Sequence, residues 1–339
     1  MRSIGKPWVR GLAGFFLAVL VLGAGLAAAV VLLDRSGFRR VGSYLVEVGW
    51  SGFIAIVVYQ LGIVFLCGAA WFALVPELHR PAMRPFFLGR LVRNGSEILP
   101  FSHVGGFFMG ARAATVAGLS GSMSFASTIV DITMELLAQL VYVGLAVVIF
   151  AMLRPGNALT RLVTSGLTAA LIVAIAFTAA QRHGFAILET MANRLTLESA
   201  AVAADGAAAI HKCIEVIYAR FWGPFSGFLL HLFCWIASAA EAWFALRLMG
   251  TNPGFAAIIS IEGLVCAARA AAFAVPSALG VQEGAYIVLG GLYGISPGTA
   301  LALSLIKRGR DLALGVPALC VWQFMEGGRI WRRFHAFSD

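Results

Sequence analysis

A long run without a charged residue, from position 11 to position 33, limits this chain to a small set of folds. A helix rises about 1.5 Å per residue, so the run is long enough to cross a hydrocarbon core about 30 Å thick. Three basic residues precede it, as in a secretory signal, but the run exceeds a signal's apolar core, so an uncleaved first span is expected. The composition agrees, because 60% of the residues are hydrophobic and 12% are charged, against about 25% charged in soluble domains.

Further apolar runs predict more membrane-spanning helices, at residues 50–75, 128–153, 162–180, 225–248, 255–275 and 299–324. We therefore expect an all-α, polytopic integral membrane protein with about seven or eight transmembrane helices. Basic residues favour the side of the two termini by 14 to 6 in the segments between runs, which predicts cytoplasmic termini. The net charge of +9 reflects this topology and not a nucleic-acid surface, because the basic residues lie at the ends of the runs.

Two apolar segments, 90–121 and 268–298, are interrupted by proline and glycine and also carry charges. Non-helical backbone at membrane depth needs protein or a water-filled cavity around it, so we expect broken or re-entrant segments here. Close helix packing explains the glycines of 284–294 equally well. The residues expected to break the helices are Pro100, Gly105, Gly106, Pro276, Gly280 and Gly284.

The two broken segments can be aligned with each other without a gap. The identical pairs in this repeat alignment fall on residues with structural meaning: Arg93 with Arg269, Pro100 with Pro276, Gly118 with Gly294, and Ser120 with Ser296. We therefore expect an inverted internal repeat within a single transmembrane domain over 1–339, with halves at about 11–180 and 221–325.

The segment between the halves, 181–220, contains no spanning run. From Val202 its apolar residues recur at helical spacing, which predicts an amphipathic helix. Two placements remain open for it: on the membrane interface, or packed against the bundle as a connector.

Four charged residues at 307–311 lie inside an apolar segment, where each would cost about 2.5–3.5 kcal/mol if it faced lipid. A helix places them on one side, and Asp311 lies one turn from Lys307 and Arg308, which favours an ion pair with either. With Arg310 the cluster keeps a surplus of positive charge. It therefore needs an anion from another helix or from a substrate.

Asp131 and Glu135 lie four residues apart on one helix face, with Gln139 extending the stripe, and are the expected partners of this cluster. Other ionisable residues in apolar segments are Arg269, Glu241, Glu262 and His231, the last expected to be a satisfied interior histidine. Two interpretations remain open: a closed network of ion pairs, or a polar cavity that receives a lipid head group or a coupling proton. The residues expected along the head-group path are Arg93, Glu97, Asp131, Glu135, Gln139, Arg269, Gln282, Glu283, Lys307, Arg308, Arg310 and Asp311.

Catalytic motifs are missing from the sequence. It has no phosphate-binding loop, no zinc-protease motif and no nucleophile elbow. Its five cysteines are scattered, with no C-x-x-C pair, so neither a disulfide framework nor a zinc site is predicted. Ser120 and Ser296 stand beside turn residues, which suits helix starts better than nucleophiles. We expect no metal, no cofactor and no ATP-driven activity.

Three blocks carry a family resemblance: EILPFSHVGG at 97–106, VDITMELLAQ at 130–139, and VPSALGVQEGAYIVLGGLYGISPGTALALSLIKRGRDLALGVP at 275–317. Together they resemble the flippase-like transmembrane family of lysylphosphatidylglycerol synthase, and within it the members associated with hopanoid biosynthesis in bacteria. The likeness extends over nearly the whole chain, and P-S-A-L-G-x-Q-E-G is its most distinctive part.

The resemblance implies a bacterial inner-membrane protein that moves lipids between leaflets, with hopanoids or anionic phospholipids as its partners. It carries functional roles over to Glu97, Pro100, Asp131, Glu135, Gln282, Glu283, Arg308 and Asp311. One position departs from the family: Phe107 stands where an acidic residue often follows the glycine pair. The short tail after 324 leaves no room for the family's soluble aminoacyl-transferase domain, so lysyl transfer is not expected.

Two other functions remain open at this point. One is a non-transporting accessory protein that docks hopanoid-pathway enzymes on the membrane through 181–220. The other is a membrane-embedded lipid-modifying enzyme that uses Asp131 or Glu135 as a base.

Overall fold

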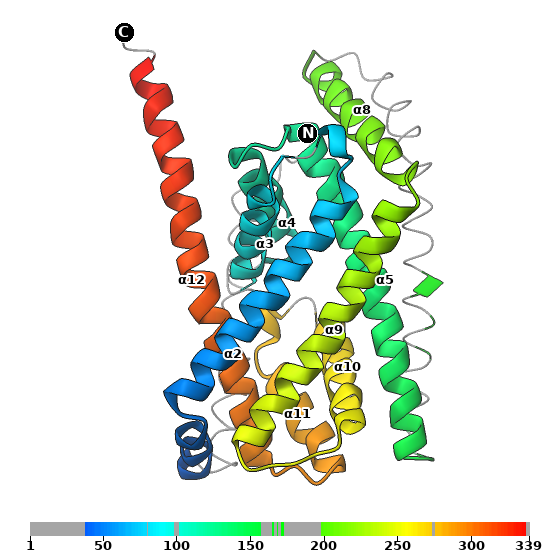
Figure 1. Cartoon of the computed structure of the whole chain (residues 1–339), viewed down its shortest axis with the longest axis vertical. Coiled ribbons are helices and arrows are strands. Elements are labelled where there is room, and N and C mark those ends of the chain that lie inside the picture. The colour runs from blue at the N-terminus through cyan, green and yellow to red at the C-terminus, as the bar shows by residue number, and fades with distance from the viewer. Residues whose placement is uncertain are drawn as a thin grey trace, which may run out of the picture.

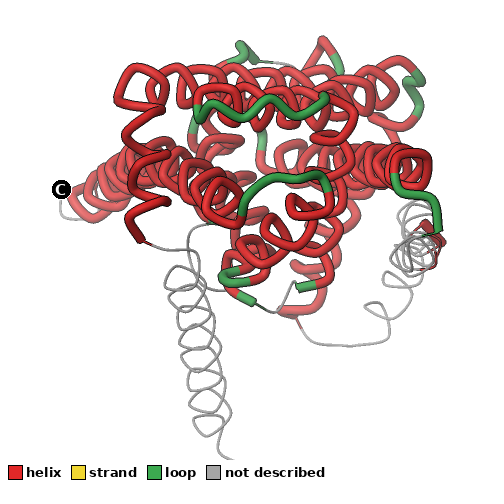
Figure 2. The backbone as a smooth tube through the Cα atoms, turned by 90° about the horizontal axis from the view of Figure 1, so that it is seen from below, coloured by secondary structure: helices red, strands yellow, loops and turns green. Residues whose placement is uncertain are grey.

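The described helices pack together as a bundle (Figures 1 and 2). The computed structural model describes residues 38–79, 81–97, 102–156, 198–272 and 275–336, together with 165, 168, 171 and 172. The expected first span at 11–33, most of the expected span at 162–180, and Pro100 lie outside these residues. The described helices are α2 (Phe38–Leu74), α3 (Arg84–Ser96), α4 (Ser102–Val116), α5 (Gly121–Leu153), α8 (Glu198–Tyr218), α9 (Trp222–Leu248), α10 (Phe255–Ala271), α11 (Val281–Leu292) and α12 (Pro297–Ala336), with short 3-10 turns at Glu77–His79 and Pro276–Ala278.

Three of these helices are long and apolar enough to cross a membrane: Val41–Leu74 in α2, Gly121–Leu153 in α5, and Trp222–Leu248. Large apolar side chains on their outer faces stay exposed, among them Phe65, Val148 and Phe233. A water-soluble protein would cover such surfaces, whereas lipid solvates them. The all-helical membrane fold expected from the sequence is therefore confirmed.

Four helices are shorter than the three candidate spans. At about 1.5 Å per residue, α3, α4 and α11 extend about 18–22 Å and α10 about 26 Å, less than the 30 Å core. They form two helical hairpins, which we call the N-terminal hairpin (α3–α4) and the C-terminal hairpin (α10–α11). In Figure 1 the first occupies the upper part of the bundle and the second the lower part. The run 255–275 contains α10, which ends at Ala271 and packs against α11 as one arm of a hairpin. That this run crosses the membrane stays a prediction.

The repeat alignment that places Arg93 on Arg269 also relates the helices of the two halves. It maps α2, α3, α4 and α5 onto α9, α10, α11 and α12 in order. Most of the mapped helix ends differ by no more than a few residues. Figure 1 shows α2 and α9 running in opposite directions, and α5 and α12 likewise. This is the arrangement expected of an inverted repeat.

The turns that end the two hairpins repeat in detail. Gly118 and Gly294 both have positive φ, of 121° and 80°, a region that L side chains rarely adopt. The next residues, Leu119 and Ile295, are both buried, and each amide donates to a carbonyl five residues back, at 3.1 and 2.9 Å. The following serine begins a helix in both halves: Ser120 is the N-cap residue of α5, and the Ser296 hydroxyl accepts the amide of Thr299 at 3.1 Å.

The hairpins pack closely where glycines face one another. A Cβ added at Gly89 would lie 2.9 Å from the Gly110 carbonyl oxygen, and one added at Gly95 would lie 2.8 Å from that of Gly315. The first pair brings the arms α3 and α4 together, and the second brings α3 against α12. Small residues allow this approach in membrane bundles, where packing replaces the hydrophobic effect between helices.

The segment after 181 is described from Glu198 onward, as α8, which lies at the top of the bundle in Figure 1. Its apolar residues Ile214 and Ile217 are fully buried and belong to one cluster with Trp71 and Met134. This supports the second placement left open by the sequence, in which the amphipathic helix packs against the bundle.

Candidate functional site

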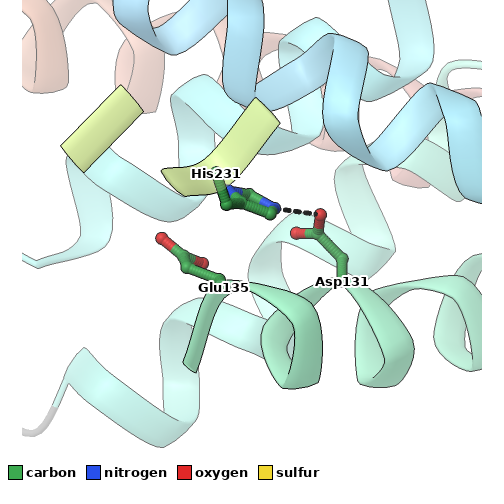
Figure 3. Close-up of side chains that lie close together, drawn as sticks. All are labelled: Asp131, Glu135 and His231. Atoms are coloured by element: carbon green, nitrogen blue, oxygen red, sulfur yellow. Dashed lines mark hydrogen bonds and ion pairs between the residues drawn. The ribbon is translucent and has the colours of Figure 1, made fainter. Parts of the chain in front are cut away.

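A buried network of five ionisable side chains joins α3, α5 and α9. Arg93 Nη1 lies 3.1 Å from Asp131 Oδ2, and its Nη2 lies 2.5 Å from Glu135 Oε2. Arg90 donates to both oxygens of Glu135, one of them at 2.8 Å. His231 Nε2 lies 2.8 Å from the other oxygen of Asp131, as Figure 3 shows. Two arginines and two carboxylates make this a balanced set, which is what burial requires.

Asp131, Glu135 and His231 also have donor atoms within 4.8 Å of one another, close enough to hold a metal ion. The carboxylate oxygens are already used, however, by the two arginines and by His231. A cation would have to displace both guanidinium groups. The arrangement therefore fits an ion-pair network better than a metal centre.

The charges at 307–311 take their partners from three other helices. Lys307 Nζ binds Glu262 of α10 at 2.5 Å, Arg308 Nε binds Glu283 of α11 at 2.5 Å, and Arg310 binds Glu241 of α9. Asp311 accepts from its neighbour Arg310 at 2.7 Å. The set thus holds three cations and four carboxylates.

Two expectations from the sequence are therefore wrong. Asp311 binds neither Lys307 nor Arg308, because both reach more deeply buried acids on other helices. Asp131 and Glu135 do not serve this cluster, because α3 supplies their arginines. The surplus positive charge at 307–311 is met by acids from other helices, which is the first of the two sources that the sequence left open.

Arg308 also holds the break in the C-terminal hairpin. Ser277 and Ala278 have φ of 51° and 47°, a strained region for residues with a Cβ. The guanidinium donates to the carbonyls of both, at 3.2 and 3.4 Å, as well as to Glu283. Glu283 in turn accepts the amide of Gly280 at 2.8 Å, which fixes the start of α11. The side chain thereby ties the strained turn to α12.

Two cavities adjoin the place where the hairpins meet. The α2 cavity, of about 340 Å³, is lined by α2 and α9 and by the polar residues of both hairpins. The α5 cavity, of about 290 Å³, is lined by α5, by Phe107 and by the arms of both hairpins. The residues that line both are Glu97, Glu135, Trp235, Arg269 and Ser277.

The hairpin tips touch each other between these cavities. The Ser277 hydroxyl of the C-terminal hairpin donates to the Glu97 carbonyl oxygen of the N-terminal hairpin at 2.8 Å. Arg269 Nη2 lies 3.9 Å from Glu97 Oε2. Glu97, the last described residue before Pro100, thus lies beside Ser277, the residue after Pro276. Pro100 itself lies outside the described residues. We call Glu97, Arg269 and Ser277 the tip contact.

The structure brings some of the predicted path residues to the cavities and leaves others out. Glu97, Glu135, Arg269, Gln282, Arg308, Arg310 and Asp311 line the α2 cavity, and Arg93 and Gln139 line the α5 cavity. Asp131, Glu283 and Lys307 line neither cavity. Sequence reasoning missed Arg90. Arg90 and Arg93 are three residues apart, and Asp131 and Glu135 are four apart, so each pair lies on one face of its helix and the two faces can form ion pairs.

One family comparison covers most of the chain. The family model described as "Lysylphosphatidylglycerol synthase TM region" matches residues 14–318. The chain belongs to this family. No curated protein and no solved structure gives a match. The match confirms the family suggested by the three sequence blocks, and with it the membrane location.

Phe107, the departure from the family pattern, has a defined place. Its ring lies under the Arg93 guanidinium, with Cζ 4.6 Å from the ring centroid. A cation over an aromatic face is stabilised by about 0.5–2 kcal/mol. The position that often carries an acid in the family here contributes an aromatic contact to an arginine that already has two acids.

Arg308→Gln should lower the stability of the folded protein. It strands the buried Glu283 and releases the strained Ser277–Ala278 turn, and breaking one partner of a buried pair costs about 3–5 kcal/mol. Arg308→Lys keeps the charge and should lose less. Thermal unfolding of the purified protein in detergent measures both. Equal melting temperatures for wild type and Arg308→Gln would contradict the structural role.

Proposed function

We propose that this protein moves lipid molecules between the leaflets of a bacterial inner membrane, with hopanoids or anionic phospholipids as substrates. The observation that carries the proposal is the pair of cavities on the two sides of the tip contact. The two hairpins enter from opposite sides and touch at their ends. The tip contact is then a thin barrier between the α2 cavity and the α5 cavity. Transporter folds of the inverted-repeat kind place their substrate site at such a repeat interface.

The linings suit an amphipathic molecule. Charged and amide side chains share the α2 cavity with Ile63, Leu279 and Leu312, and the α5 cavity adds Ile132 and Leu136. A polar head group needs such partners inside a membrane, where an unsatisfied polar group costs several kcal/mol. The acyl or hopane part can remain in the bilayer, since large apolar side chains cover the outer faces of the spans.

The accessory role through 181–220 draws no support from the described part of that segment. Ile214 and Ile217 of α8 are buried against the bundle. We therefore rank docking of hopanoid-pathway enzymes second, after lipid transport. The lipid assay below separates the two functions.

Orientation is part of the proposal. With both termini in the cytoplasm, as the basic residues predict, the N-terminal hairpin enters from the cytoplasmic side and the C-terminal hairpin from the opposite side.

Reconstitution into liposomes tests the function. Fluorescent phosphatidylglycerol and a fluorescent hopanoid derivative are placed in one leaflet, and a membrane-impermeant quencher reports the outer-leaflet fraction over time. We expect faster exchange of at least one of these lipids than in protein-free vesicles and in vesicles that contain an unrelated helical protein. Exchange at the protein-free rate for both lipids would contradict the proposal and favour the accessory role.

A further inference from the structure

Arg93 and Arg269 occupy equivalent places in the two halves but have different partners. Arg93 is 8% exposed and binds both Asp131 and Glu135. Arg269 faces the cavities, with 41% of its side chain exposed, and its one charged partner among the described residues is Glu97, at 3.9 Å. That distance is too long for a hydrogen bond.

A reversal of charge explains the difference. The repeat alignment places Lys307 where the first half has Asp131, and Asp311 where it has Glu135. Lys307 is a cation and is itself neutralised by Glu262 at 2.5 Å. Asp311 is engaged by the neighbouring Arg310, through Nε at 3.0 Å and Nη2 at 2.7 Å. Both acids that hold the first arginine are therefore lost to the second.

Among the described residues, Arg269 is thus a cation without a hydrogen-bond partner, and it lines both cavities. A guanidinium has five N–H donors, and none of them makes a hydrogen bond to the residues that the structure describes. Planar bidentate pairing with phosphate or carboxylate is the arrangement that a guanidinium favours most. Glu97, half-exposed and at 3.9 Å, is a loosely held competitor for that place.

We propose that Arg269 binds the phosphate of an anionic lipid head group and that this phosphate displaces Glu97. The inference rests on the proposed lipid translocation and narrows its substrate to phosphate-bearing lipids. Displacement of Glu97 removes the ionic half of the tip contact, leaving only the hydrogen bond from Ser277 to join the hairpin tips. A head group without a negative charge would not displace Glu97 from Arg269, so the tip contact would stay closed.

Binding of short-chain lipids to the full-length protein in detergent tests this site. The probes are dihexanoyl phosphatidylglycerol, dihexanoyl glycerol, which lacks the phosphate, and inorganic phosphate, and the readout is isothermal titration calorimetry. The variants are Arg269→Gln, Arg269→Lys and Glu97→Gln. Arg112→Gln is the matched control, because it removes an arginine that is 45% exposed, paired with Glu326, and outside both cavities.

We expect wild type to bind the phospholipid and to bind the glycerol lipid and inorganic phosphate far more weakly. Arg269→Gln should weaken phospholipid binding about tenfold or more, as the loss of a charged hydrogen-bonding partner implies, and Arg269→Lys less. Glu97→Gln should tighten binding by several-fold, because the competitor is gone. Arg112→Gln should match wild type.

The opposite results would overturn the site. They are unchanged phospholipid binding in Arg269→Gln, weaker binding in Glu97→Gln, or equal affinity for inorganic phosphate and the phospholipid. If Arg269→Gln fails to fold, the sign of the Glu97→Gln effect still decides. Binding that follows these expectations in a protein that moves no lipid in liposomes would reject the proposed function and keep the anion site. Lipid movement in liposomes, together with unchanged lipid binding in Arg269→Gln, would reject the anion site and keep the proposed function.

Discussion

Asp131→Asn should abolish the recovery of folded protein. Asp131 is 1% exposed and joins three helices, since it accepts from Arg93 of α3 and binds His231 of α9 from its own place on α5. The change leaves two buried arginines with Glu135 as their sole carboxylate partner among the described residues. Breaking a buried pair costs about 3–5 kcal/mol, and native domains have about 5–15 kcal/mol in total.

The matched control is Glu326→Gln, which removes the acid of the Arg112 pair between α4 and α12. That pair is partly exposed, and such pairs contribute about 0–1 kcal/mol. The measurement is the monodisperse fraction in size-exclusion chromatography after expression as a fluorescent fusion, followed by thermal unfolding. If Asp131→Asn matched Glu326→Gln in yield and melting temperature, the network would have no structural role.

The charges at 307–311 were expected to need partners inside the bundle, and they have them, but the sequence assigned the wrong acids to them. A charge inside an apolar segment must be paired, and that follows from the energy of burial alone. Which acid pairs with Lys307 depends on where the fold places α10 relative to α12, across 45 residues of chain. Helical periodicity contains no information about that placement.

The hairpins show the same limit. The proline and glycine breaks at Pro100 and Pro276 predicted non-ordinary segments, and the alignment between them predicted a repeat. The run 255–275 nevertheless looks like a span, because a buried hairpin arm and a membrane span share the same composition. The structure shows the hairpin directly: α10 stops at Ala271 and the chain turns at Ser277.

Arg269, which makes no hydrogen bond to the described residues, could have been located from the sequence once the repeat was known. Aligning the halves sets Asp131 against Lys307, so one arginine of the equivalent pair must lose its partner. The sequence does not reveal that Glu97 of the other hairpin stands nearest to Arg269, because that contact joins residues in different halves of the chain. The pseudo-symmetry of the two halves therefore indicates where the site lies. The pair that breaks the symmetry, Asp131 against Lys307, indicates that Arg269 differs from Arg93.

The tip contact is the centre of the account, because lipid that passes from one cavity to the other must cross it. The contact between the described tips is weak. It consists of one hydrogen bond from Ser277 to the Glu97 carbonyl and one long ion pair between Arg269 and Glu97. Contacts of this strength can open without unfolding the hairpins, whose own arms are fixed by glycine packing and by Arg308.

Locking the tips tests this most directly. Glu97→Cys and Ser277→Cys are combined in a chain whose five native cysteines are replaced by alanine, and a short methanethiosulfonate cross-linker joins them. The control joins His211→Cys to Glu215→Cys, one turn apart on α8 and away from both cavities. We predict that cross-linked tips reduce lipid exchange in liposomes to the protein-free rate, that a reducing agent restores it, and that the α8 cross-link has no effect. Exchange that continues at full rate with the tips cross-linked would contradict the account.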